Sequence, residues 1–292
     1  MNAGAETAGM RDYIGFGLRI RSAIDLPGAI DTDAGDAELT IDTGAVAAVA
    51  MPDGEPPYAL TDNGFVFAPP GVARYRFLAS AVRVIVDPLP GADPEMVGAL
   101  LIATTLPAII WARGGFMLHA AAAIPPGGTH AVAIAGPSGS GKSTLLARLV
   151  AAGWIVVGED SLALTCEGDD VIAAGLPSVL WRCDGPDREN RTAVPIPPAQ
   201  QAARAPLAAI LHLDAGLTGD NAIINPLALP QAIATILANR HRPRLAQLMQ
   251  LEAAALPVVA TFCRRLEMHR LTSGDPSRIA LQHLAALASP TA

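Results

Sequence analysis

The sequence predicts an α/β fold in which a small β-rich N-terminal domain, residues 1–92, precedes a larger α/β domain, residues 93–292. Three observations lead to this prediction. Short strand-like runs separated by turn residues fill the chain as far as Pro88. A proline-dense segment from Asp87 to Pro94 marks the boundary. Beyond it, a glycine-rich motif stands between an apolar run and an amphipathic run, which predicts a strand, a loop and a helix.

Composition indicates a globular protein with a substantial core. Of the 292 residues, 51% are hydrophobic and 16% are charged, and the formal net charge is -7. This length suits one large or two small domains. An acidic chain without a strong cluster of Lys and Arg lacks the basic surface that binds phosphate backbones, so we expect no nucleic-acid partner.

The N-terminal domain is predicted to consist of short strands joined by turns. Several runs alternate apolar and polar residues with a period close to two. The predicted strands are Phe16 to Ile20, Glu38 to Ile41, Phe65 to Phe67, Arg74 to Leu78 and Val82 to Val86. Gly, Pro, Asn and Asp clusters separate them, since these residues favour tight turns. The predicted turns are Asp25 to Gly28, Asp62 to Gly64 and Pro69 to Gly71.

A long apolar run opens the second domain. Val97 to Ala112 contains no charged residue and ends at Arg113. Because a membrane-spanning helix needs about 20 apolar residues, and because Pro107 interrupts this run, we favour a buried helix over a membrane segment.

Two further features concern the compartment. Residues Met1 to Arg11 lack the apolar stretch of a secretory signal. The three cysteines, Cys166, Cys183 and Cys263, lack zinc-ligand and C-x-x-C spacing. We therefore expect a cytoplasmic protein without a membrane span, whose cysteines are core thiols.

The motif itself is complete. Residues 136 to 143 match G-x-x-x-x-G-K-[ST], and Ala131 to Ala135 before them has the apolar, partly β-branched character of a buried strand. Glycines in such a loop let consecutive N–H groups converge on phosphate oxygens at the positive end of the next helix. A glycine-rich turn that only caps a helix is the alternative. The residues predicted to bind a nucleotide are Gly136, Pro137, Ser138, Gly139, Ser140, Gly141, Lys142, Ser143 and Thr144.

The remaining elements follow from periodicity and turn signals. The predicted strands are Phe116 to Ala123, Trp154 to Val157, a hairpin of Leu162 to Cys166 with Val171 to Ala174, Leu207 to Leu213, and Glu267 to Leu271. A long polar loop with Arg188, Arg191 and Arg204 is predicted from Asp184 to Ala205. The predicted helices are Ser143 to Ala152, Pro230 to Ala238, Arg244 to Ala255, Pro257 to Arg264, and Pro276 to Leu287 capped by Asp275.

Two acidic residues and a histidine are candidates for catalysis. Glu159 and Asp160 follow the strand after the loop's helix, at the strand end where α/β sheets place their sites. Phosphoryl transfer needs an acidic group there to hold Mg²⁺ and to orient or deprotonate the attacking hydroxyl. A solvated acidic pair in a turn is the alternative. His119 lies inside an otherwise apolar strand, where a core histidine is the alternative to a catalytic one.

These motifs resemble the catalytic domain of HPr serine kinase/phosphorylase and its bacterial relatives. The resemblance rests on the order of Leu118-His119-Ala120, the loop at 136 to 143, and the run from Gly153 to Asp160. Gly17 to Ser22, Leu26-Pro27-Gly28 and Val86-Asp87-Pro88 are also similar to the N-terminal segment of HPr-kinase-related proteins, some of which occur in peptide-modifying pathways, including those for lasso peptides. Where the family usually has Asp-Asp, this chain has Glu159-Asp160.

The resemblance implies an ATP-dependent serine kinase that acts on a peptide or protein, with ATP and Mg²⁺ as cofactors and homo-oligomers as a possibility. It implies that Lys142 holds the triphosphate, Ser143 and Asp160 hold Mg²⁺, and Glu159 accepts the hydroxyl proton. It also implies that His119 positions the transferring group. We do not find the segment used for dephosphorylation by the bifunctional enzymes, so phosphorylase activity is not expected.

Two other functions remain open on the sequence. One is a non-catalytic nucleotide-sensing module whose N-terminal domain binds a peptide, which the unusual Glu159 favours. The other is an ABC-type ATPase, because the loop resembles an ABC cassette loop. Against the ATPase, Leu271 to Asp275 only partly matches an L-S-G-G-Q signature, and no long apolar strand ends in Asp-Glu.

Overall fold

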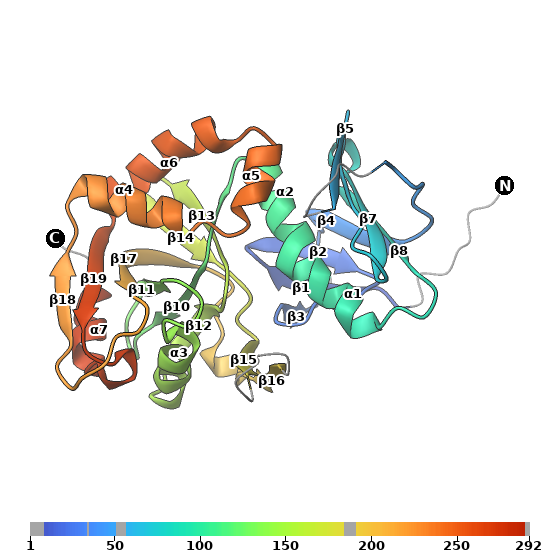
Figure 1. The fold of residues 1–292 in the computed structure, drawn as a ribbon. Coiled ribbons are helices and arrows are strands. Elements are labelled where there is room, and N and C mark those ends of the chain that lie inside the picture. Colours follow the sequence, from blue (N-terminus) through green and yellow to red (C-terminus); the bar gives the residue numbers. More distant parts are fainter. Residues whose placement is uncertain (1–8, 34, 51–56, 184–190, 290–292) are drawn as a thin grey trace.

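The computed structural model describes residues 9–33, 35–50, 57–183 and 191–289. It is a mixed α/β fold with one eight-stranded sheet, one nine-stranded sheet and a separate two-stranded hairpin. The chain starts with strands, as predicted, and the helices come later (Figure 1). The division at residue 92 stays a prediction, because a single hydrophobic cluster runs from the first strands into the second sheet.

The N-terminal sheet has the strand order β3-β1-β2-β4-β8-β7-β6-β5. Its strands are β1 (Arg11–Gly15), β2 (Leu18–Ser22), β3 (Ile30–Thr32), β4 (Leu39–Thr43), β5 (Tyr58–Thr61), β6 (Gly64–Phe67), β7 (Ala73–Leu78) and β8 (Arg83–Pro88). Strand β4 runs parallel to both β2 and β8, and the other neighbours are antiparallel.

The predicted turns are present in this sheet, but one predicted strand is wrong. Phe16 to Ile20 includes a tight turn, because Phe16 and Gly17 both have positive φ values, of 53° and 77°. The turn joins β1 to β2, and β1 itself was not predicted. Strand β5 was also missed, although Asp62 to Gly64 connects it to β6 as a hairpin turn should.

Aromatic side chains form the core face of this sheet. Tyr58, Phe65, Phe67, Tyr75 and Phe77 are buried, and their rings pack in pairs, such as Tyr58 on Phe67 with centroids 4.7 Å apart. Burial raises the pKa of both tyrosine hydroxyls. The hydroxyls therefore stay protonated, and each donates to a backbone carbonyl of the following helix. Tyr75 donates to Val97 at 2.9 Å and Tyr58 to Thr104 at 3.3 Å.

The apolar run after the boundary is a helix of three parts. These are α1 (Pro94–Leu100), a π-helical turn η2 (Leu101–Thr105) and α2 (Leu106–Ala112). Pro94–Ala112 is long and apolar enough to cross a membrane, with a mean hydropathy of 1.7, but 67% of the most apolar window is buried inside the protein. It lies between the N-terminal strands and the rest of the chain (Figure 1), as the prediction of a buried helix requires.

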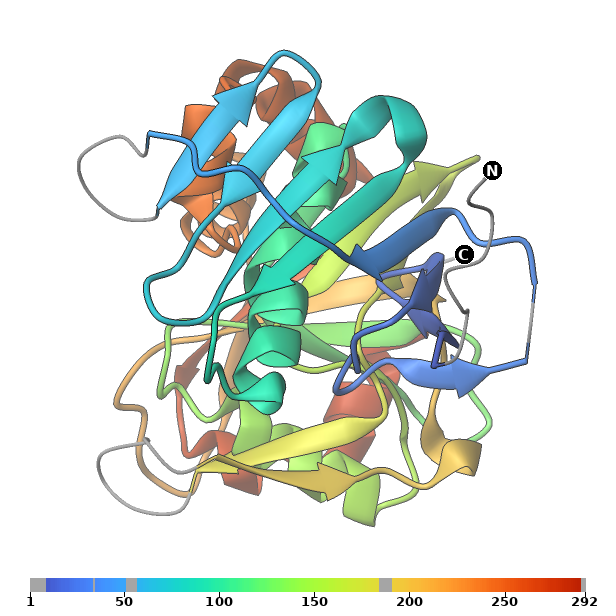
Figure 2. The same cartoon turned by 90° about the vertical axis from the view of Figure 1, so that its right-hand side faces the viewer.

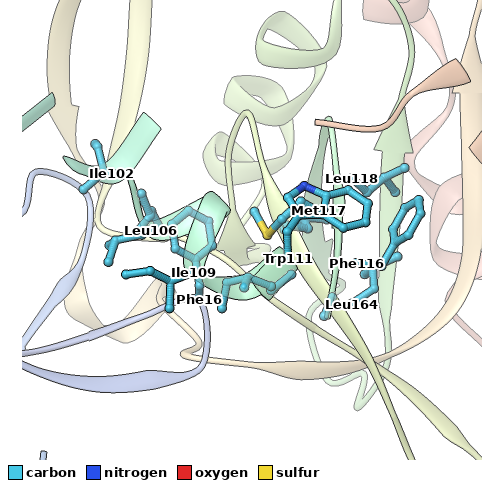
Figure 3. Packing of buried hydrophobic residues seen from close by; sticks show 14 of the residues in the cluster. Phe16, Ile102, Leu106, Ile109, Trp111, Phe116, Met117, Leu118 and Leu164 are labelled. Atoms are coloured by element: carbon cyan, nitrogen blue, oxygen red, sulfur yellow. The ribbon is translucent and has the colours of Figure 1, made fainter. Parts of the chain in front are cut away.

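Side chains from this helix and from both sheets pack into one cluster. Figure 3 shows Ile102, Leu106 and Ile109 of the helix beside Phe16 of the N-terminal turn, and Trp111 beside Phe116. The Trp111 and Phe116 rings meet edge to face with centroids 5.1 Å apart. The N-terminal sheet, the helix and the second sheet therefore share one core; Figure 2 shows the same arrangement from the side.

The second sheet has the order β12-β10-β11-β17-β14-β13-β9, with β19 beside β17 and β18 beside β19. Its strands are β9 (Phe116–Leu118), β10 (Ala120–Ile124), β11 (Ala131–Ala135), β12 (Ile155–Gly158), β13 (Leu162–Glu167), β14 (Asp170–Ala174), β17 (Ala205–Leu213), β18 (Ile223–Pro226) and β19 (Glu267–Ser273). Strand β10 is antiparallel to both β11 and β12, so β11 and β12 end at the same edge. Strand β17 is parallel to β11 and ends there too.

The helices of the second part are α3 (Lys142–Ala151), α4 (Leu229–Ala238), α5 (Pro243–Leu248), α6 (Glu252–Arg265) and α7 (Leu281–Leu287). The predicted helix Arg244 to Ala255 is wrong, because Gln250 has a φ of 57° and interrupts it. Pro257 lies inside α6 instead of starting a helix. The predicted helix Pro276 to Leu287 is split: Asp275 caps a short 3-10 turn, η4 (Pro276–Arg278), and Ile279 is extended before α7.

Two other expectations need correction. The predicted loop Asp184 to Ala205 contains strand β16 (Arg191–Pro195), which pairs with β15 (Val179–Cys183), and the turn η3 (Pro198–Gln200). Arg188 lies outside the described residues.

Among the cysteines, Cys166 is exposed at the end of β13, so it is not a core thiol. Cys263 is half-buried, and burial raises the pKa of its thiol to about 11.

Candidate active site

The loop between β11 and α3 has the backbone that phosphate binding requires. Gly136, Gly139 and Gly141 have φ values of 149°, 83° and 94°, which side-chain-bearing residues rarely adopt. Helix α3 begins at Lys142, one residue earlier than predicted, with Gly141 at its N-cap. The loop therefore joins a buried strand to a helix N-terminus, where backbone N–H groups and the helix dipole favour an anion.

Gly136 is closely surrounded by neighbouring protein atoms. A Cβ atom there would lie 2.4 Å from the carbonyl oxygen of Leu213 and 2.7 Å from Ser140 Oγ. Ser140 Oγ is itself buried and has no hydrogen-bond partner in the described part of the chain. A buried hydroxyl without a partner is costly unless a ligand supplies one, so Ser140 is a candidate donor to a bound phosphate.

We expect backbone strain in Gly136→Ala to lower the free energy of unfolding by about 1–3 kcal/mol. The clash of the added Cβ atom should lower it further, and the variant should bind a nucleotide more weakly. Gly127→Ala is the matched control, because Gly127 also has a positive φ, of 73°, but an added Cβ there would meet nothing within 4 Å. Urea unfolding of both variants measures the difference. Equal losses of stability would mean that the close approach to Leu213 is unimportant.

Lys142 lies within the loop. Its Nζ donates to the carbonyl oxygens of Gly136 at 2.7 Å and Pro137 at 3.0 Å, and the residue is 8% exposed. Ser143 and Thr144 are exposed in the first turn of α3. In the described residues, no hydrogen bond or ion pair joins Ser143 to Asp160, so the predicted magnesium ligands are not yet in contact. Lys142 is also the only lysine in the chain.

His119 lies at a break that the sequence did not predict. The expected strand Phe116 to Ala123 is two strands, because β9 pairs with β13 while β10 pairs with β11 and β12. His119 falls between them, and its Nδ1 lies 2.8 Å from the carbonyl oxygen of Asp160 and 3.7 Å from the Asp160 carboxylate. His119 is therefore partly exposed beside Asp160 and is not enclosed in the core.

The acidic pair separates into two environments. Asp160, with a φ of 67°, lines the same pocket as His119. Glu159 is 5% exposed, and its carboxylate accepts a hydrogen bond from the backbone N–H of Trp181 at 2.7 Å. Glu159 thus connects the end of β12 to β15, and Asp160 is the acid that faces the cavity.

The cavity at the strand ends has a volume of about 290 Å³. The phosphate loop contributes Gly136 and Pro137, and the strand ends contribute His119 and Asp160. The remaining lining comes from residues 238–242, between α4 and α5. Of the predicted site residues, the structure thus brings His119, Asp160 and the start of the loop together, with Lys142 in contact with the loop carbonyls.

Residues 239–242 were missed by the sequence analysis. Two backbone bonds pair this segment with β9, from His119 N to the Asn239 carbonyl at 2.7 Å and from His241 N to the Met117 carbonyl at 2.8 Å. Trp111 Nε1 donates to the carbonyl of His241 at 3.2 Å. The run Asn-Arg-His-Arg-Pro-Arg, unusual in a chain with few charges, was the available signal.

The π-helical turn also reaches the cavity. The carbonyl oxygen of Ala103 accepts from His241 Nε2 at 3.2 Å and from Arg242 Nε at 3.0 Å. A π turn shifts the helix hydrogen-bond pattern and often occurs at functional sites. Here its carbonyl positions two residues of the cavity wall.

A second group of polar residues lies at the end of β17, next to β11, the strand that precedes the phosphate loop. The two carboxylate oxygens of Asp214 accept a pair of hydrogen bonds from Arg270 at 2.8 and 2.9 Å, and Asp214 is 3.3 Å from His212 Nε2. His212 Nδ1 lies 3.2 Å from the Asn239 side-chain amide. An acidic residue directly after an apolar strand was a signal that sequence reasoning could have used for Asp214.

His241 is neutral in the folded protein at neutral pH. Burial lowers its pKa from 6.5 to about 4, although the nearby Asp160 carboxylate opposes the shift. Because the unfolded chain binds a proton more readily, the free energy of unfolding falls as pH drops from about 6.5 to about 4.

We expect His241→Gln to remove the pH-dependent part of the free energy of unfolding that His241 contributes, which is on the order of 3 kcal/mol. The difference in unfolding free energy between wild type and variant, measured by urea denaturation at several pH values, should change across this window. A constant difference would contradict the buried, neutral state. His212, whose pKa burial also lowers, is present in both proteins and cancels in the comparison.

No family model and no curated protein matches the chain. Among solved structures, the chain is similar to the HPr(Ser) kinase/phosphatase from Coxiella burnetii, with a TM-score of 0.36 and 12% sequence identity over 58% of this chain and 93% of that chain. A likeness of this degree does not by itself identify a family or a reaction.

Proposed function

We propose that this chain is an ATP-dependent serine kinase that transfers the γ-phosphate to a hydroxyl group of a peptide or protein. The observation that carries the proposal is the position of Lys142. Its ammonium group contacts the carbonyls of Gly136 and Pro137, which line one cavity together with His119 and Asp160. A cationic phosphate ligand and two proton-transferring groups at one cavity are what phosphoryl transfer requires.

The loop would hold the nucleotide through its own groups. The backbone N–H groups from Ser138 to Ser143 and the hydroxyl of Ser140 would donate to phosphate oxygens, while Lys142 would exchange its two carbonyl partners for the β and γ phosphates. Ser143 and Asp160 would hold Mg²⁺, which when bound neutralises phosphate charge.

The acceptor hydroxyl would enter from the side of His119 and Asp160. The sequence assigned the base to Glu159, but its carboxylate is buried and already bonded to Trp181 N. Asp160 faces the cavity, and His119 is hydrogen-bonded to it through Nδ1. We therefore assign orientation and deprotonation of the hydroxyl to these two residues, and a positioning role to Glu159.

The test is intact-mass spectrometry of serine-bearing peptides encoded near this gene, after incubation with the full chain, ATP and Mg²⁺. We expect the mass of one phosphate to be gained by a substrate peptide and by no peptide whose serines are replaced by alanine. Glu159→Gln should retain much of the activity, and Asp160→Asn should lose it. If Glu159→Gln instead loses activity and Asp160→Asn retains it, Glu159 is the base.

A nucleotide-sensing module is the second candidate, and the buried Glu159 favours it. In this chain the first acidic position supports the fold instead of facing the cavity. ATP binding by calorimetry, with no phosphate gain in any peptide tested, would favour this function over the kinase.

A further inference from the structure

Three possible metal ligands meet at the cavity from three separate elements. His119 comes from the break between β9 and β10, Asp160 follows β12, and His241 lies between α4 and α5. Their nearest ligand atoms all lie within 4.8 Å of one another. The His119 and His241 rings are 6.2 Å apart between centroids.

Each imidazole is oriented by a backbone carbonyl. His119 Nδ1 is 2.8 Å from the carbonyl oxygen of Asp160, and His241 Nε2 is 3.2 Å from that of Ala103. A carbonyl only accepts, so these two nitrogens carry hydrogen, and the lone pairs are on Nε2 of His119 and Nδ1 of His241. Metal-binding histidines almost always have such a second hydrogen bond, which fixes the tautomer and the ring orientation.

The backbone fixes the spacing of the two histidines. The bonds from His119 N to the Asn239 carbonyl and from His241 N to the Met117 carbonyl pair the two segments as neighbouring strands. Trp111 Nε1 donates a hydrogen bond to the His241 carbonyl. The cluster is therefore built into the fold and does not depend on side-chain rotamers of long, mobile residues.

We propose that His119, Asp160 and His241 bind a divalent transition-metal ion such as Zn²⁺ or Mn²⁺, with at least one coordination position open to the cavity. Two imidazole nitrogens and one carboxylate oxygen suit these ions, whereas Mg²⁺ prefers oxygen ligands. Ligand atoms around tetrahedral Zn²⁺ lie about 3.4 Å apart, so the three side chains need to move closer together to hold the ion. The site shares His119 and Asp160 with the proposed phosphoryl transfer, but metal binding by the nucleotide-free chain can be tested without that reaction.

Metal binding by the nucleotide-free full chain tests this proposal. After chelation and dialysis against Zn²⁺ or Mn²⁺, we expect about one ion per chain by elemental analysis, and a large excess of Mg²⁺ should not displace Zn²⁺. Replacement with Co²⁺ should give visible d–d bands without the near-ultraviolet band of sulfur ligation, which excludes binding at Cys166.

The variants His119→Ala and His241→Gln should each weaken Zn²⁺ binding by roughly tenfold or more. His283→Ala removes an exposed histidine of α7 and should leave binding unchanged. Far-UV circular dichroism verifies that each variant is folded, and His119, with 26% of its side chain exposed, is the safer substitution. Binding that persists in both pocket variants, or that is absent from the wild-type protein, would overturn the proposal.

Discussion

Replacing Lys142 with alanine is expected to reduce phosphate transfer by on the order of 10²–10³-fold, the usual loss when one preorganised electrostatic group is removed from a reacting centre. Lys142 is the one lysine in the chain, and its ammonium lies on the loop carbonyls where the phosphates would bind. Intact-mass spectrometry of the peptide product measures the loss. Thr129→Ala, a change at an exposed turn residue before the other end of β11, should have a small effect.

The same residue allows a measurement that does not need the acceptor. Because Lys142 is the only lysine, an amine-reactive reagent can modify only its side chain and the N-terminal amine. Bound ATP should protect Lys142 and leave the N-terminus reactive. Lack of protection at ATP concentrations that saturate binding would mean that the nucleotide lies elsewhere, and both the kinase and the sensing module would then be wrong.

The loop and its flanking elements were predictable because their signals are contiguous. Gly136, Gly139 and Gly141 are needed at fixed spacing, and an apolar strand and an amphipathic helix flank them within a few residues. The strand before Glu159 and Asp160 was predictable for the same reason. Local patterns report local structure, so these predictions needed no knowledge of the tertiary fold.

The opposite wall of the cavity was not predictable in this way. His241 is brought to His119 by a backbone pairing between segments more than one hundred residues apart, and no periodicity encodes that pairing. The separate environments of Glu159 and Asp160 depend on Trp181 of β15, a strand for which the sequence analysis predicted no element. The helix predicted from Arg244 to Ala255 was wrong because Gln250 has a positive φ value, which periodicity does not reveal.

The contacts of the buried helix suggest how the two sheets influence one site. Its π turn offers the Thr104 carbonyl to Tyr58 of the N-terminal sheet and the Ala103 carbonyl to His241 and Arg242 of the cavity. Adjacent carbonyls of one turn thus hold a strand on one side and the cavity wall on the other. The helix end at Trp111 adds a second connection to His241.

Trp111→Ala is accordingly expected to cost about 3–5 kcal/mol of unfolding free energy, the usual range for a buried large aromatic residue. Trp111 is 2% exposed, packs on Phe116, and donates to the His241 carbonyl. Leu256→Ala is the matched control, because Leu256 is an apolar helix residue that is 50% exposed, and its loss should stay within about 0.5 kcal/mol.

Trp111→Phe separates packing from hydrogen bonding. It retains most of the buried ring but leaves the His241 carbonyl without its donor, which should cost about 1–3 kcal/mol beyond the lost ring area. Because that carbonyl belongs to the cavity wall, this variant should also weaken Zn²⁺ binding while Leu256→Ala does not. Urea unfolding followed by circular dichroism measures the first effect. If Trp111→Phe matches wild type in both measurements, the indole hydrogen bond does not position His241, and the backbone pairing with Met117 and the Ala103 carbonyl hold the wall in place without it.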